Sequence, residues 1–412
     1  MANVVTRVQP SLRAAVRNQE GVLPVRSDSV YDKIAGLEDE VVSATVAVTA
    51  ADLALVVDEL RGAMPSLIPG LRTLVLDGNH LRAAQHRIKP LRGLPQAALP
   101  GTCVALLDVD RRLIVDVFLL QDAHASEMQV LSQVVTRIRP GDLVLADRNL
   151  NTREFVAAVE DRQAFYLVRE HGNRFPLEFV GQRTLVGNSD IGVVYEQQAR
   201  YQVAGCWRTV RRVTVELHQP TRDGDVVLHL LTNLPTQVVD PATGDTVVID
   251  GVKIAESYGA RWTVEKAFYQ LTVELHCELN TLGYPPAALF GFCVAAMCYN
   301  AYSAATAALR NHFGANRVEK EFSTYYMAND VRTVWEGMHV VIPEETWSQA
   351  FGQLTLSQLA QYLLELAGRI NPARYRKAPT RPRRPPVKGA SQRAKSNHAS
   401  IAKELKKHSL KR

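Results

Sequence analysis

Three acidic residues have the sequence surroundings of a metal-dependent active site. Asp77 follows the apolar run TLVL and Asp147 follows the apolar run LVLA, so each is predicted at the carboxyl end of a strand. In open α/β sheets, ligands bind outside that edge. The third acid, Glu265, lies on a predicted helix with Tyr258 and Arg261. At ~100° per residue, their spacing places these three side chains within about a 60° arc of one helix face.

Each of these residues also has an ordinary structural interpretation. Asp77 and Gly78 form a common turn pair, and Asp147 could cap the helix that follows it. Arg261 and Glu265 could form a solvated helix pair that contributes only about 0.2 to 0.5 kcal/mol. The chemistry therefore depends on whether the fold brings the three acids together.

The elements around the acids predict an α/β (α+β) fold. From Arg72 onward the chain has three short apolar strands, a helix, a strand and a helix. Three meandering strands followed by alternating helix and strand match an RNase H-like core, in which a mixed sheet is flanked by helices. Residues 164–236 are rich in strand patterns and turn residues. They predict an antiparallel β insertion between the second and third acids.

The chain is long enough for two to three domains. Its patterns divide it into six segments: a small helical N-terminal region (1–70), the first part of the core (71–163), the β-strand insertion (164–236), the second part of the core with the Glu265 helix (237–312), a C-terminal helical region (313–370) and a basic disordered tail (371–412).

Positive charge is concentrated in the tail. Residues 371–412 hold fourteen Lys or Arg against Glu404 alone, which gives +13 and leaves −7 for the rest of a chain whose net charge is +6. A polycation attracts a polyanion such as nucleic acid, although a solubilising terminus would have the same composition. The Pro and Lys/Arg content cannot build a core, so we expect the tail to be disordered.

Cysteine usage and hydropathy favour a cytosolic protein. The five cysteines are scattered and form no C-x-x-C pair, which argues against a disulfide framework or a zinc site. The first twenty residues lack the continuous apolar stretch of a secretory signal. Residues 279–309 contain no charged residue and are long enough to span a bilayer. Their Asn, Pro, Gly and alanine content instead predicts a buried helix, so we expect no membrane partner.

Taken together, the motifs resemble those of the DDE transposases of bacterial insertion sequences, of the IS-four type with a Tyr-Arg-Glu-Lys signature. The resemblance spans about residues 72–300, through LDGNHL around Asp77, LADRNLNTREF around Asp147 and YGARWTVEKAF around Glu265. The order of the acids, the β insertion and the Y-x-x-R-x-x-x-E spacing all agree. One position departs, because the family's lysine, seven residues after the glutamate, falls at Thr272. This departure bears on activity and DNA-end affinity more than on the fold.

The resemblance implies a DNA transposase with a three-acid active site. Asp77, Asp147 and Glu265 are the implied catalytic residues and metal ligands. Carboxylates suit Mg²⁺ or Mn²⁺, and two ions would offset the repulsion between the acids. By the resemblance, water first attacks at the transposon end, and the freed 3′-hydroxyl then attacks target DNA.

The resemblance also implies DNA-binding residues and partners. Tyr258 and Arg261 are expected to bind a phosphate near the cleaved end, Trp262 to stack on a base, and Lys266 to contact DNA. The partners are transposon ends and target DNA, and paired-end chemistry implies a homodimer in the active complex. The implied location is the bacterial cytoplasm, in association with the nucleoid.

Two alternative functions remain open from the sequence. The chain could be a catalytically inactive or domesticated transposase derivative that only binds DNA, for which Thr272 is the motive. It could also be an RNase H-like DNA nuclease that cleaves without strand transfer. Loss of metal-dependent nicking in Asp147→Asn would exclude the first, and formation of a joined product would exclude the second.

Overall fold

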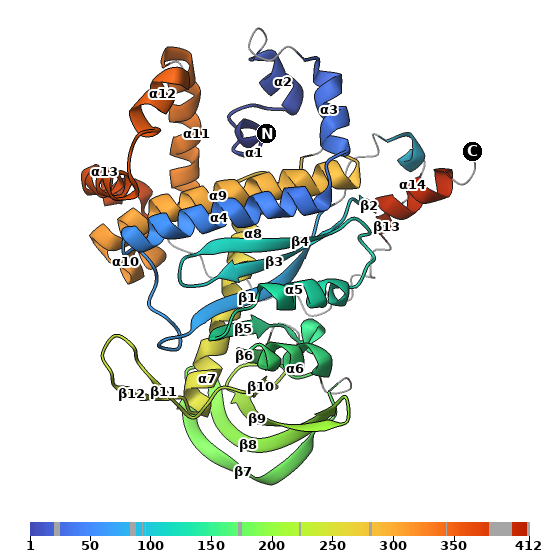
Figure 1. Cartoon of the computed structure of the whole chain (residues 1–412), viewed down its shortest axis with the longest axis vertical. Helices are drawn as coiled ribbons and strands as arrows, with labels where there is room; N and C mark the ends of the chain where they lie inside the picture. The colour runs from blue at the N-terminus through green and yellow to red at the C-terminus, as the bar shows by residue number, and fades with distance from the viewer. Residues whose placement is uncertain are drawn as a thin grey trace.

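The largest sheet has nine strands. It extends from the middle of the molecule, at β4, to the lower end of the view, at β7 (Figure 1). The computed structural model describes residues 1–19, 25–82, 88–92, 94, 96–171, 175–221, 224–279, 282–342, 344–378 and 398–409. The strands are ordered β4-β3-β1-β5-β6-β10-β9-β8-β7. The first five of these are β4 (Leu113–Leu120), β3 (Thr102–Asp108), β1 (Arg72–His80), β5 (Asp142–Ala146) and β6 (Phe165–Arg169).

These five strands form an RNase H-like core. Strand β3 pairs antiparallel with both β1 and β4, whereas β5 pairs parallel with both β1 and β6. The three-stranded meander and the parallel strand β5 are predicted, and the fold class is confirmed. The predicted insertion boundary at residue 164 is wrong, because β6 pairs parallel with β5 and therefore belongs to the core sheet. A hairpin turn joins β3 and β4, and Arg112 within it has a φ of 61°.

The strand-rich insertion extends the core sheet instead of forming a separate layer. Its four long strands are antiparallel: β7 (Glu178–Ser189), β8 (Gly192–Val203), β9 (Cys206–Leu217) and β10 (Val227–Thr232). Strand β10 pairs antiparallel with β6 of the core. A small hairpin follows, formed by β11 (Gln237–Val239) and β12 (Thr246–Val248). The insertion and the core therefore share one continuous sheet.

Both faces of the core sheet are buried, because successive side chains of a strand point to opposite faces. On β1, Leu74 and Leu76 pack in one cluster with helices α5 (Leu131–Arg137) and α6 (Arg153–Asp161). Val75 lies in the other cluster, with helices α8 (Trp262–Val273) and α9 (Pro285–Phe313). Asp77 is two residues after Val75 in the strand, so its side chain points to the same face of the sheet, which α8 covers.

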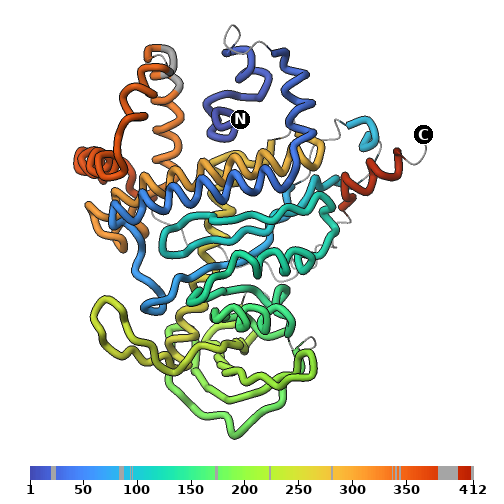
Figure 2. The backbone as a smooth tube through the Cα atoms, in the orientation of Figure 1, coloured from blue at the N-terminus to red at the C-terminus, as the bar shows by residue number. Residues whose placement is uncertain are grey.

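Helices from both ends of the chain cover the β4 side of the sheet. The N-terminal helices are α1 (Ala2–Val5), α2 (Leu12–Arg17), α3 (Ser27–Ala35) and α4 (Asp39–Glu59). The C-terminal helices are α10 (Ala315–Glu321), α11 (Thr324–Val341), α12 (Glu344–Phe351) and α13 (Leu356–Arg369). Helices α4 and α9 lie side by side and both contact β4, as the backbone trace shows (Figure 2). The N-terminal region thus packs on the core.

Within the described residues, two helices are long and apolar enough, by length and composition alone, to cross a membrane. They are α4 and α9, and they differ in burial: 72% of the most apolar window of α9 is buried in the fold, against 22% for α4. The burial of α9 agrees with the predicted buried helix. Helix α4 leaves Val41, Val48 and Leu55 exposed.

The segment around Glu265 is not the single long helix that its amphipathic pattern predicts. It consists of helix α7 (Gly251–Tyr258), a 3-10 turn η4 (Gly259–Arg261) and α8. A 3-10 turn has fewer residues per turn than an α-helix, so it changes the direction of side chains across the junction. The single helix on which the predicted 60° arc was based is therefore wrong, although Arg261 and Glu265 do pair.

The tail is not disordered throughout, and that expectation is wrong for its described residues. They form a 3-10 turn η5 (Pro372–Tyr375), a short strand β13 (Ala399–Ser400) and a helix α14 (Ile401–Ser409). Strand β13 pairs with β2 (Ala98–Leu99), and Ile401 is buried against the 3-10 turn η1 (Lys89–Leu91). The apolar Ala399, Ile401 and Leu405 interrupt the basic run and provide this contact. Residues 379–397 and 410–412 lie outside the described residues.

Candidate active site

Asp77 and Asp147 lie at one edge of the sheet, on neighbouring parallel strands. The pairing between β1 and β5 ends at Leu76 and Ala146, and each aspartate is the next residue. Strand β1 itself continues to His80, so Asp77 lies within the strand, opposite Ala105 of β3. Asp147 precedes the 3-10 turn η3 (Arg148–Leu150), and its side chain does not cap that turn. The predicted shared edge is therefore present.

Arg261 joins Asp77 to Glu265. Its Nη1 lies 3.4 Å from Oδ2 of Asp77, and its Nη2 lies 2.8 Å from Oε1 of Glu265. The guanidinium is buried, with 8% of the residue exposed, and it also lies 4.5 Å from the ring centre of Trp262. One cation therefore serves two carboxylates from distant parts of the chain.

Tyr258 places a phenol beside this group. The residue is 6% exposed, and its hydroxyl has no hydrogen-bond partner among the described residues. Burial raises the pKa of Tyr258 above its usual range, and the charges of Asp147 and Asp77 raise it further while that of Arg261 lowers it. The hydroxyl is thus a free donor close to the acids.

Glu127 is a fourth acid at this edge that the sequence did not predict. It begins the 3-10 turn η2 (Glu127–Val130), which Ser126 caps by accepting from the N–H of Met128. A Cβ atom on Gly78 would overlap the Glu127 carboxylate, so this carboxylate lies directly against β1 next to Asp77. Glycine inside a strand often marks such a close approach, and Gly78 was the available signal.

The acids at this edge are short of positive charge. Burial raises the pKa of Asp77 to about 7, against the lowering effects of Arg261 and of the Gly78 N–H, with Asp147 and Glu127 adding to the rise. Burial also raises the pKa of Glu127; His80 lowers it and Asp147 raises it. Neither Asp147 nor Glu127 forms an ion pair with any residue in the described part of the chain.

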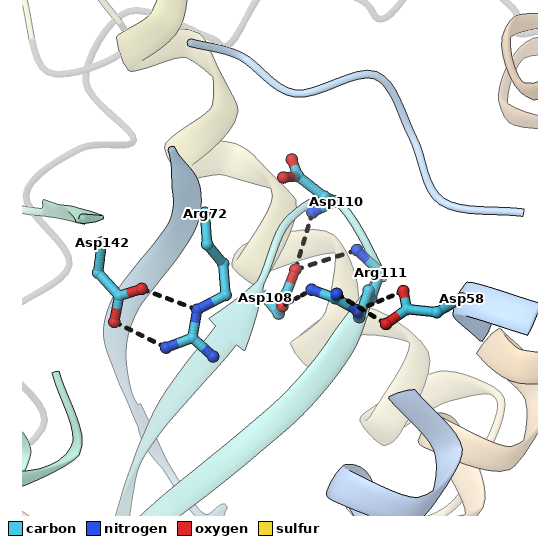
Figure 3. A network of polar contacts seen from close by, with 6 residues as sticks. All are labelled: Asp58, Arg72, Asp108, Asp110, Arg111 and Asp142. Atoms are coloured by element: carbon cyan, nitrogen blue, oxygen red, sulfur yellow. Dashed lines mark hydrogen bonds and ion pairs between the residues drawn. The ribbon is translucent and has the colours of Figure 1, made fainter. Parts of the chain in front are cut away.

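At the opposite end of β1, acids are paired with arginines (Figure 3). Arg72 donates to Asp142 through Nε and Nη2 at 2.8 and 2.7 Å. Arg111 binds Asp58 of α4 through two hydrogen bonds of 2.8 and 2.9 Å and contacts Asp108 at 3.1 Å. This network ties α4 and the β3–β4 turn to the sheet.

The sheet edge with Asp77, Asp147, Glu265 and Glu127, which we call the acidic edge, offers carboxylate ligands for a divalent cation. These ligands do not surround a single ion position. Among the described residues, no three His, Cys, Asp or Glu side chains lie close enough together to hold one ion. Carboxylate oxygens are nevertheless the ligands that Mg²⁺ and Mn²⁺ prefer, and partly buried acids without cations are costly unless a cation is supplied. The side chains of Asp77, Asp147, Glu265 and Glu127 fit this role, which stays a prediction.

The exposed face of α8 carries the other predicted DNA-binding residues. Trp262 is 55% exposed and Lys266 is also exposed. Tyr269, which the sequence analysis did not single out, is 62% exposed. Spacings of four and seven residues place all three on one face of the helix. That spacing could have identified Tyr269.

Thr272 and the residues beside the aspartates take local structural positions. The Thr272 hydroxyl donates to the carbonyl of Phe268, one turn back along α8. His80 shares a 2.8 Å hydrogen bond with Thr102. The Nδ2 atom of Asn79 is buried with no partner among the described residues. None of these three contacts an acid through a hydrogen bond.

A family match covers the assigned core. The family described as "Transposase DDE domain" matches residues 68–301, a range that includes Asp77, Asp147 and Glu265. No curated protein matches by sequence. A cryo-EM structure of the piggyBac transposase in a synaptic complex with hairpin DNA is similar with a TM-score of 0.36 and 11% identity. That similarity covers 73% of this chain and 57% of the piggyBac chain.

Proposed function

Because this chain belongs to the transposase DDE domain family, we propose that it is a metal-dependent DNA transposase of a bacterial insertion sequence. The observation that carries the proposal is the acidic edge, where Asp77 and Asp147 follow the last paired residues of β1 and β5 and Arg261 links Asp77 to Glu265. Such an edge suits cleavage of a transposon end and transfer of the freed strand into target DNA.

Asp77, Asp147 and Glu265 would hold the divalent ions, with Glu127 as an additional carboxylate. When bound, Mg²⁺ or Mn²⁺ supplies positive charge to the attacking and leaving oxygens of an in-line phosphoryl displacement. The chain's own carboxylates position that charge at the sheet edge.

Arg261 is suited to exchange partners when DNA binds. Its guanidinium now bridges two carboxylates, and a planar guanidinium binds a phosphate with the same two-pronged geometry. The free hydroxyl of Tyr258 can donate to the same phosphate. Trp262 and Tyr269 offer exposed rings for stacking on unpaired bases beside that phosphate.

The finer assignment is to the IS-four type with a Tyr-Arg-Glu-Lys signature. Tyr258, Arg261 and Glu265 occupy the signature positions, and the burial of Tyr258 and the ion pair from Arg261 to Glu265 support their acting as a unit. Lys266 is an exposed cation on the same helix, whereas Thr272 is hydrogen-bonded within it. Terminal DNA, target DNA and a homodimeric complex are the partners that this assignment implies.

Thr272, which stands where the signature has a lysine, supports a second candidate function. In this candidate the chain is a transposase derivative that binds DNA without cutting it. Cleavage of DNA that carries the element's own ends, with Mg²⁺ or Mn²⁺, distinguishes the two. We expect the unaltered chain to nick and join DNA, and Asp77→Ala, Asp147→Ala and Glu265→Gln to lose at least about a hundredfold in rate. DNA binding without any cleavage by the unaltered chain would favour the second candidate, and cleavage without joining would identify a nuclease.

A further inference from the structure

A positively charged cavity lies beside α8, in contrast to the negatively charged acidic edge. This cavity of about 180 Å³ is lined by the β3–β4 turn, by helices α8, α9 and α10, by the beginning of α11 and by Lys377. Its lining includes four cations and one acid: Arg112, Lys266, Arg310, Lys377 and Glu319. This basic cavity, as we call it, has no part in the acidic edge, although both are lined by α8.

The two arginines of the basic cavity share a single carboxylate. Arg112 lies 3.6 Å from Glu319, and Arg310 lies 4.0 Å from it. Arg310 is 3% exposed, and its Nε donates to the carbonyl of Gly62 at 2.6 Å. The Nε of Arg112 is buried and has no hydrogen-bond partner among the described residues. Glu319 therefore compensates two guanidinium groups incompletely.

This imbalance has an energetic consequence. Burial lowers the pKa of Arg310 to about 10, with Glu319 raising it and Arg112 lowering it further. A buried cation without full compensation is costly, and an anion that restores charge balance and accepts the free N–H stabilises the site. A tetrahedral phosphate group offers several strong acceptor oxygens, and the cavity volume admits one.

We propose that the basic cavity binds a backbone phosphate of the nucleic-acid strand that the acidic edge cleaves, so the inference rests on the proposed function. Lys266 lines the cavity and directly follows Glu265 in α8. The exposed Trp262 lies one turn before Lys266 on the same helix. A nucleic-acid strand that crosses α8 would therefore meet the carboxylates, the exposed ring of Trp262 and the cavity within about two turns of the helix.

Two measurements on the full chain test the proposal, one with inorganic phosphate and one with short single-stranded DNA in EDTA. Arg112→Gln and Lys266→Gln each remove one cation of the cavity, and Lys266 is exposed, so its variant should fold. Lys320→Gln is the matched control, because Lys320 is an exposed cation of α10 that does not line the cavity. All three variants lose the same formal charge.

We expect phosphate, compared with chloride at equal ionic strength, to raise the melting temperature of the unaltered chain and of Lys320→Gln. The rise should shrink in Arg112→Gln and Lys266→Gln. Both cavity variants should bind single-stranded DNA about tenfold more weakly than Lys320→Gln, with a salt slope smaller by about one. Glu319→Gln, which removes the one acid, should show a larger phosphate effect than the unaltered chain.

The proposal would be overturned if Arg112→Gln, Lys266→Gln and Lys320→Gln bound DNA with equal affinity. A loss of the phosphate effect in the two cavity variants without any loss of their DNA affinity would also overturn it, because the ligand would then be a small phosphate compound. These outcomes are separable from failure of the proposed function. That failure would appear as absence of metal-dependent cleavage in the unaltered chain, whatever the cavity variants bind.

Discussion

Acids gather at both ends of strand β1, but the two ends differ in how these acids are paired with cations. At the beginning of β1, Asp142 receives a two-pronged bond from Arg72, and Asp58 and Asp108 share Arg111. At the far end, Asp77 and Glu265 share one arginine, while Asp147 and Glu127 have no ion pair within the described part of the chain.

We interpret this difference as a division between acids that stabilise the fold and acids that, in the proposed function, hold a ligand. A paired acid contributes to stability, and its loss leaves a buried arginine without a partner. An unpaired acid costs stability in the free protein, and strongly shifted groups of this kind cluster at functional sites. Asp110 is the exception at the paired end, since burial and the neighbouring Asp108 raise the pKa of its carboxyl to about 6.

The largest effect on stability should come from the paired end. Asp142→Asn removes the partner of Arg72 and weakens the acceptor of the Arg139 N–H, so the free energy of unfolding should fall by on the order of 3 kcal/mol. Urea unfolding followed by circular dichroism measures this change. A loss below about 0.5 kcal/mol, the range of ordinary surface substitutions, would mean that the pairing is not structural.

At the far end of β1, where Asp77 has only a 3.4 Å ion pair with Arg261, the same kind of substitution should stabilise the protein. Burial raises the pKa of Asp77 to about 7, so the folded state holds this proton more tightly than the unfolded chain does. Stability from this group is present below about pH 4 and is lost as the pH rises through about 7. In EDTA, Asp77→Asn should therefore gain on the order of 2 kcal/mol at pH 8 and nothing at pH 4. Equal stability of the two proteins at pH 8 would contradict the comparison.

A smaller effect should follow from moving Glu127 without changing any charge. Gly78→Ala places a Cβ atom where the Glu127 carboxylate lies, whereas Gly259→Ala, its control in η4, meets no atom within 4 Å. We expect Gly78→Ala to weaken Mn²⁺ binding about tenfold, since altering one partner of a metal site costs about 10- to 100-fold in affinity. Calorimetric titration with Mn²⁺ checks this. If both alanine variants bind Mn²⁺ equally well, Glu127 takes no part in the site.

The sequence predicted the core because its signals are local. Apolar runs before Asp77 and Asp147 identified β1 and β5, and their order identified the sheet. It did not predict Glu127, because contact between η2 and Gly78 depends on how a later turn packs over an earlier strand. The break at Gly259 was also missed, since the amphipathic pattern continues across it. In the tail, Ile401 forms a nonlocal contact with η1 that composition cannot show.

The most direct test of the account is Mn²⁺ binding by the full chain, compared with Asp77→Asn and Asp142→Asn. Both variants lose one carboxylate, and they differ in the end of β1 from which it is lost. The account predicts that the unaltered chain and folded Asp142→Asn bind Mn²⁺ with similar affinity and that Asp77→Asn loses at least about tenfold. No binding by the unaltered chain, or equal binding by all three, would contradict the claim that the acidic edge is kept for a divalent cation.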